Sequence, residues 1–152
     1  MARPKRPPQI IGWREKIALP ELGVAAMPAK VDTGARTSAL HAADIETFHV
    51  DGADWVRFRV ISSDADDRIA EAPIVDERAI RNTSGIPELR LVIRVALVLG
   101  AHRWHVETSL ADRERMEFDL ILGRTALRGR RIVVHPGRSW LAGPPMADET
   151  GD

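Results

Sequence analysis

The sequence predicts an all-β domain, a closed β-barrel with one short helix near its C-terminal end. Several segments alternate apolar and polar residues with period two, and helical periodicity is scarce. Ten prolines and eleven glycines divide the chain into short pieces. The 152 residues suffice for one domain with a core, expected at 9–142. Residues 1–8 form a basic, Pro-rich tail and residues 143–152 an acidic one, and both are expected to be disordered.

The expected strands follow from local patterns. Val56, Phe58 and Val60 alternate with Trp55, Arg57 and Arg59 after an Asp-Gly turn signal at 51–52, which predicts the second strand of a hairpin. Residues 89–99 keep apolar side chains in one phase, and the opposite face is partly apolar. We expect this strand to be covered on both faces or to lie near a dimer contact. Residues 100–103 turn the chain into a further strand. Residues 124–128 form the short helix, which ends at Gly129.

Composition excludes several classes of function. Lys and Arg number 22 and so do Asp and Glu, so no overall basic field favours nucleic acid as a partner. The absence of cysteine excludes disulfides and cysteine-ligated zinc. No apolar run is long enough to cross a bilayer, and the start lacks the apolar segment of a secretory signal. The expected location is therefore the cytoplasm, without a membrane partner.

The segment that carries chemistry is Asp32-Thr33-Gly34-Ala35, which follows an apolar strand. By itself an Asp-Thr-Gly triplet is most often only a loop at the end of a strand. The residues around the triplet favour a functional role. Gly34 lets another backbone approach closely, and Ala35 keeps the neighbourhood small. A second signal, Ile-Leu-Gly at 121–123, lies far downstream, just before the short helix.

These blocks resemble the retropepsin-like aspartic endopeptidases, and in particular a bacterial branch often labelled ATP-dependent zinc proteases. The resemblance covers roughly residues 10–141. Its blocks occur in order at 11–15, 18–20, 29–42, 55–58, 108–113, 116 and 122–124. The resemblance implies peptide-bond hydrolysis by two carboxylates that share a proton across a water molecule. Asp32 would be the catalytic acid, Thr33 would brace its loop, and Gly34 would contact substrate.

One copy of the motif in the chain leaves the site half complete. The second carboxylate would come from Asp32 of a second chain across a two-fold axis, so an active enzyme would be a homodimer. The resemblance also implies a flap over the site. Its candidate is the segment 78–89, with a tip at Asn82, Thr83, Ser84 and Gly85. An ordinary loop is the alternative interpretation of that segment.

The predicted substrate contacts are Ala35, Arg36, Thr83, Ser84, Gly85 and Arg124. In retroviral relatives acidic residues follow Asp-Thr-Gly-Ala, whereas here Arg36 and Thr37 follow it, so Arg124 lacks an acidic partner at those positions. Arginines near a cleft favour carboxylates, which predicts an acidic, glutamate-rich peptide substrate. The resemblance also implies association with an ATP-grasp glutamate ligase. Alternatively, Arg124 pairs with another acid, such as Asp112 or Glu114.

The sequence predicts neither a metal nor another cofactor. No His-Glu-x-x-His pair or phosphate-binding loop is present. His102 and His105 are three apart around a turn and strand, which makes them poor co-ligands. His41 is either a site residue or a packed, hydrogen-bonded histidine. A second unexplained histidine, His135, stands before a proline where this branch has an aspartate. The main rival to an endopeptidase is a catalytically idle retropepsin-like module that binds or dimerises and regulates a glutamate ligase.

Overall fold

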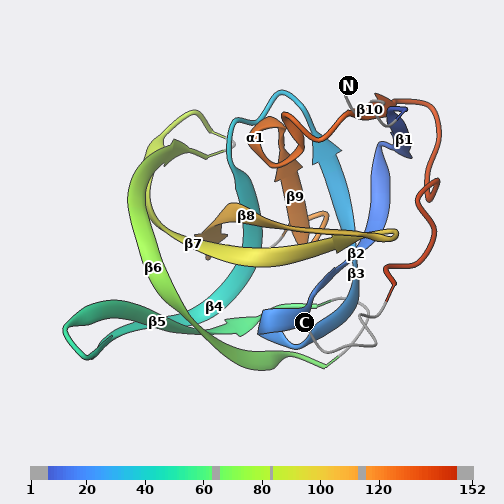
Figure 1. The fold of residues 1–152 in the computed structure, drawn as a ribbon. Coiled ribbons are helices and arrows are strands. Elements are labelled where there is room, and N and C mark those ends of the chain that lie inside the picture. The colour runs from blue at the N-terminus through green and yellow to red at the C-terminus, as the bar shows by residue number, and fades with distance from the viewer. Residues whose placement is uncertain (1–6, 63–65, 83, 113–115, 147–152) are drawn as a thin grey trace, which may run out of the picture.

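The computed structural model describes residues 7–62, 66–82, 84–112 and 116–146, and its secondary structure is almost entirely strand (Figure 1). A 3₁₀ turn, η1 (Pro20–Leu22), and one helix, α1 (Arg124–Leu127), interrupt the strands. The strands are β1 (Gln9–Gly12), β2 (Arg14–Leu19), β3 (Val24–Asp32), β4 (Ser38–Val50), β5 (Ala53–Val60), β6 (Arg68–Arg81), β7 (Pro87–Leu99), β8 (His102–Ala111), β9 (Leu120–Gly123) and β10 (Ile132–His135).

The main sheet closes on itself. Its order is β2-β3-β9-β4-β5-β6-β7-β8, and two further pairings, β2–β7 and β4–β8, join strands that are not neighbours in that order. One closed circuit therefore runs β2-β3-β9-β4-β8-β7, and a second runs β4-β5-β6-β7-β8. The second circuit extends to one side in the ribbon view (Figure 1). The all-β prediction with one short helix before the C-terminal end is confirmed.

Strand β7 belongs to both circuits, which explains its composition. It pairs with β2, β6 and β8, and from Val92 to Leu99 all but one of its residues are buried. The expectation that residues 89–99 are covered on both faces is confirmed for the C-terminal part of the strand, whereas Leu89 is 70% exposed. Its side chains join a single core with those of β2, β3, β5, β8 and β9. A strand buried on both faces must be apolar in both phases, as residues 95–99 are.

The Asp-Gly turn occurs as predicted. Asp51 and Gly52 have φ angles of 49° and 80°, so both central residues adopt the left-handed conformation of a two-residue hairpin between β4 and β5. Strand β6 extends from 68 to 81 and so includes the first residues of the predicted flap segment, 78–89. Residues 1–6 and 147–152, the greater part of both predicted tails, lie outside the described residues. Next to the second of these, the Met146 N–H donates to the Gly100 carbonyl at 2.8 Å.

A buried carboxylate fastens the segment after β10 to the body of the domain. Glu15 is 0% exposed, and it accepts hydrogen bonds from the backbone N–H groups of Gly12, Leu141 and Ala142 at 2.6, 2.8 and 3.1 Å. Trp140 adds a second contact, because the Arg14 guanidinium lies 5.1 Å from its ring centroid. One side chain of β2 thus holds two segments that are far apart in sequence.

We expect Glu15→Ala to lower the free energy of unfolding by about 3 kcal/mol, because it leaves three backbone donors without their acceptor. Urea unfolding monitored by circular dichroism measures this change. The matched control is Glu117→Ala, which removes an exposed carboxylate and should alter stability by no more than about 0.5 kcal/mol. Equal effects of the two substitutions would contradict the structural role of Glu15.

Candidate active site

The predicted catalytic residue lies where two parallel strands end together. Asp32 is the last residue of β3, and the pairing of β3 with β9 places it opposite Gly123. The Asp32 carboxylate is half-buried, and its Oδ1 atom accepts the N–H of Gly34 at 3.0 Å. The Ala35 N–H donates to the Asp32 carbonyl at 3.1 Å, which closes a tight turn. The loop of residues 33–37, here called the Asp32 loop, therefore fixes the direction of this carboxylate.

Gly123 packs against the backbone of the Asp32 loop. A Cβ atom at this position would lie 2.8 Å from the Thr37 carbonyl carbon and 2.9 and 3.0 Å from the carbonyl oxygens of Ala35 and Arg36. The Gly123 N–H donates to the Oγ atom of Ser38, which is fully buried, at 3.0 Å. Only glycine allows this approach without displacing backbone. The two sequence signals, at 32–35 and 121–123, thus meet as one unit.

The start of α1 holds the outer side of the same loop. The Arg124 N–H donates to the Ala35 carbonyl at 2.8 Å, and its guanidinium Nη1 donates to the Gly34 carbonyl at 3.1 Å. The Thr125 hydroxyl donates to the Arg36 carbonyl at 2.6 Å. The Arg124 guanidinium is thus anchored on the loop and forms no pair with Asp112, while Glu114, the other acid considered for it, lies outside the described residues.

A cleft of about 1020 Å³ opens beside the Asp32 loop. The loop and α1 form one wall, and β6 with one residue of β8 forms the other. The lining residues are Gly34, Ala35, Arg36, Thr37, Asp76, Arg78, Ala79, Ile80, Arg81, Glu107 and Thr125. Three predicted residues, Gly34, Ala35 and Arg36, thus face a common space, and Arg124 donates hydrogen bonds to the carbonyls of the first two. Asp32 and Thr33 adjoin the cleft along the chain without lining it.

Acidic and basic side chains of the far wall neutralise one another. Arg78 donates to the Asp76 carboxylate through Nε and to the Glu107 carboxylate through Nη2, each at 2.6 Å. The hydrogen bonds from Arg78 and from the Glu77 backbone N–H hold the pKa of the Asp76 carboxyl below its usual value. The hydrogen bonds to Glu107 and, to a lesser extent, to Asp76 raise the pKa of Arg78. The Asp76 carboxylate therefore stays charged and paired with Arg78 at neutral pH.

The predicted flap is a hairpin between β6 and β7, which curves up beside the Asp32 loop (Figure 1). The Asn82 side-chain oxygen accepts the N–H groups of Ser84 and Ile86 at 2.9 and 3.0 Å, and Gly85 has a φ of 79°. Ser84 and Gly85 form the tip and do not line the cleft, whereas the stem residues 78–81 do. Thr83 lies outside the described residues.

Two further histidines have defined places. His41 is 8% exposed, and its backbone N–H donates to the Asp119 carbonyl at 2.9 Å, so it is a packed residue of β4. His135 is exposed at the end of β10, where its Nδ1 atom accepts the Gly137 N–H at 3.1 Å. Among the described residues, no three His, Asp or Glu side chains gather in a way that could hold a metal ion.

The sequence interpretation placed residues 78–81 in the flap segment but missed Asp76, Glu107 and Thr125 as residues of the cleft. Asp76 and Arg78 are two apart on β6 and so point to one face of that strand. A longer strand at 68–81 would have predicted their pairing. Glu107 lies on β8 and meets Arg78 only through the closed sheet, while Thr125 lies on α1 in the opposite wall, so no local pattern identifies either residue.

This arrangement agrees with comparisons to known proteins. The family model described as "Retropepsin-like aspartic endopeptidase RimB" matches residues 10–145. The chain belongs to the RimB-like family. The predicted resemblance to bacterial retropepsin-like endopeptidases is thereby confirmed.

The RimB-like domain is also similar to part of longer proteins. It is 43% identical over 128 residues to a "Probable alpha-L-glutamate ligase" of Desulfotalea psychrophila, covering 82% of this chain and 28% of that protein. A protein of the same description from Parasynechococcus marenigrum is 42% identical over 143 residues, covering 92% and 30%. The chain thus spans less than a third of the length of these curated relatives.

A solved structure shares the fold. The crystal structure of protein Lpg0085 from Legionella pneumophila superposes with a TM-score of 0.77 at 28% identity, covering 88% of this chain and 98% of that one. The described residues of the RimB-like domain include no helix long and apolar enough to span a membrane.

We expect Gly123→Ala to destabilise the RimB-like domain by roughly 2 kcal/mol, because the added methyl group meets three backbone atoms of the Asp32 loop at 3.0 Å or less. Urea unfolding measures the loss, and amide chemical shifts of residues 32–38 report displacement of the loop. Gly137→Ala is the matched control, since its nearest neighbour would lie at an ordinary 3.4 Å. A loop with unchanged shifts in Gly123→Ala would contradict the packing described.

Proposed function

We propose that this protein is an aspartic endopeptidase whose active site contains two Asp32 carboxylates, one from each subunit of a homodimer. The observation that carries the proposal is the locked Asp32 loop at the paired ends of β3 and β9, in a chain of the RimB-like family. A carboxylate held by the N–H of Gly34 is preorganised to face a reacting group.

The pairing of the acids that line the cleft supports the proposal of a second subunit. Asp76 and Glu107 are the carboxylates that line it, and both are bound by Arg78. An acid engaged by a guanidinium is held in its ionised form and is a poor proton donor. Because the chain carries one copy of the motif, the proposed proton-sharing partner of Asp32 is Asp32 of a second subunit related by a two-fold axis.

The proposed reaction uses the two carboxylates as one titrating pair. The ionised carboxylate removes a proton from a water molecule, whose oxygen forms a bond to the carbonyl carbon of the peptide. The protonated carboxyl donates to the developing oxyanion. The C–N bond of the tetrahedral intermediate then breaks as its nitrogen receives a proton, which leaves a carboxylate product and an amine product.

We further propose acidic, glutamate-rich peptides as substrates. Arg36 and Arg81 project charge into the cleft, while Arg78 is already neutralised by its two acidic partners. Arg124 uses one guanidinium nitrogen for the Gly34 carbonyl. Guanidinium groups bind carboxylates by paired hydrogen bonds, which favours glutamate side chains. The glutamate ligases related to this chain act on the same chemical group by name.

The second candidate function is a non-catalytic module that binds or regulates a glutamate ligase. The similarity to one part of "Probable alpha-L-glutamate ligase" proteins favours it, since a domain that occurs within longer chains can act through its neighbours. Both functions predict a partner that carries or makes glutamate chains. They differ in whether the Asp32 carboxylate is needed.

We expect Asp32→Asn to reduce cleavage of a peptide substrate by at least about a hundredfold, because an amide cannot exchange the proton that the reaction requires. Liquid chromatography of the products measures cleavage, and circular dichroism verifies folding. Subunit mixing tests the shared site. When wild-type chains exchange with a ninefold excess of Asp32→Asn chains, activity per wild-type chain should fall to about a tenth, since nearly all wild-type chains then pair with the variant.

Native mass spectrometry shows whether mixed dimers have formed and so controls the mixing experiment. Undiminished activity per wild-type chain in verified mixed dimers would contradict the shared site. Full cleavage by Asp32→Asn would contradict the catalytic role and leave the non-catalytic module as the better account.

We expect a glutamate-tailed peptide to be cleaved with a kcat/KM about tenfold above that of its glutamine counterpart, because each glutamate carboxylate lost removes a charged hydrogen bond. Arg36→Ala should reduce this ratio, whereas Arg128→Ala removes an exposed arginine outside the cleft and should preserve it. Equal kcat/KM for the two peptides would contradict acidic specificity while leaving the endopeptidase itself intact.

A further inference from the structure

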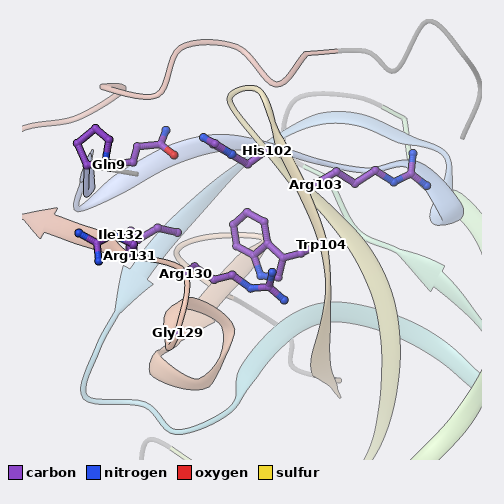
Figure 2. Close-up of a pocket in the computed structure, with 9 residues that line it drawn as sticks. Gln9, His102, Arg103, Trp104, Gly129, Arg130, Arg131 and Ile132 are labelled. Atoms are coloured by element: carbon purple, nitrogen blue, oxygen red, sulfur yellow. The ribbon is translucent and has the colours of Figure 1, made fainter. Parts of the chain in front are cut away.

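A second pocket lies at the far end of α1 from the Asp32 loop. It has a volume of about 500 Å³ and is bounded by the start of β8, the turn between α1 and β10, and the start of β1 (Figure 2). This volume falls in the range of small-molecule sites. The pocket shares no lining residue with the cleft beside Asp32.

A tryptophan fixes one arginine in this pocket. Trp104 is 8% exposed, and its indole Nε1–H donates to the Ala126 carbonyl at 2.9 Å. The Arg130 guanidinium lies over the ring at 5.5 Å from its centroid (Figure 2). This cation–π contact orders the guanidinium without using its N–H donors. Arg130 therefore presents a preoriented fork of donors to the pocket.

The remaining polar residues around Arg130 are also donors or cations. Arg131 follows it directly, and the Arg131 backbone is held in the left-handed conformation, with its carbonyl accepting the Gln9 N–H at 2.9 Å. Arg103 and Arg131 extend from opposite rims in Figure 2, with His102 between them. No Asp or Glu occurs among the described residues that line the pocket. The site is thus positively charged in a chain whose overall net charge is zero.

We propose that this pocket binds a phosphate-bearing ligand, with Arg130 and Arg131 as its main contacts. A single carboxylate carries one charge and two acceptor oxygens, which one guanidinium satisfies. A phosphate group carries about two negative charges and three acceptor oxygens, so it can engage neighbouring guanidinium groups together. A chain of phosphates carries enough negative charge to engage both Arg130 and Arg131. The nearly buried Trp104 offers little surface for stacking a base, so recognition rests on the phosphates.

The compact shape of the pocket favours a phosphate-bearing ligand over an acidic peptide. Carboxylates along an extended peptide are several ångströms apart and need a groove, whereas the cations here surround one pocket. The side chain of Arg131 must turn inward on binding, which costs side-chain entropy. Inorganic triphosphate and the phosphate chain of a nucleotide are the two sources of this chemistry.

Isothermal titration calorimetry at constant ionic strength tests the proposal with inorganic triphosphate, ATP and triglutamate as probes. We expect triphosphate and ATP to bind the wild-type chain, and Arg130→Ala to weaken that binding by about tenfold or more. A higher affinity for ATP than for triphosphate would identify a nucleotide as the source. Arg128→Ala removes the same charge from the same turn but not from the pocket, and should bind as the wild type does.

The Trp104 signal and a second variant provide independent tests of phosphate binding. The indole N–H signal of Trp104, assigned with Trp104→Phe, should shift when triphosphate binds. Arg131→Ala provides an independent variant if Arg130→Ala fails to fold. The proposal would be overturned by absence of triphosphate binding at millimolar concentration, by equal loss in Arg128→Ala, or by triglutamate binding as tightly as triphosphate. None of these readouts depends on peptidase activity.

Discussion

The close contact between Gly123 and the backbone of the Asp32 loop is the constraint on which the site depends. It brings together two segments that are far apart in sequence. This close approach is possible because Gly123 has no Cβ atom. The Ser38 hydroxyl accepts the Gly123 N–H, and the Ser109 hydroxyl donates to the Ser38 carbonyl, so the contact is continuous with the buried pairing of β4, β8 and β9. The direction of the Asp32 carboxylate is therefore set by the core of the domain rather than by the loop alone.

The closed sheet explains why this loop faces a cleft. Strands β3 and β9 are parallel and end together, and β4 begins immediately after the loop. Because β4 and β7 belong to both circuits, β6 is carried to the far side of the loop and supplies the opposite wall. Arg78 pairs with the two carboxylates of that wall, Asp76 and Glu107. The other charged residues that line the cleft are Arg36 and Arg81. The acids of the far wall, which are paired with Arg78, are thus distinct from Asp32, the proposed catalytic acid.

Local sequence patterns predicted much of the frame and part of the site. The Asp-Gly hairpin, the doubly covered strand β7 and the helix after Gly123 each leave a pattern within a few residues, because backbone conformation and burial are decided there. The two motifs predicted the Asp32 loop through family resemblance. The pairing of Arg78 with Glu107, and the buried Glu15 with its three donors, join segments far apart in the chain. No local pattern encodes such contacts, since they arise only when the sheet has closed.

Helix α1 is too short to be stable by its own propensity, so its contacts must hold it. At its start, Arg124 and Thr125 bind three carbonyl groups of the Asp32 loop. Toward its end, the Ala126 carbonyl accepts the Trp104 indole N–H, and Ala126 and Leu127 are buried. The same tryptophan that orders Arg130 therefore also fixes the helix that holds the Asp32 loop. The phosphate pocket and the proposed active site are distinct in their lining residues but share one rigid element, whose position is decided by tertiary hydrogen bonds at both of its ends.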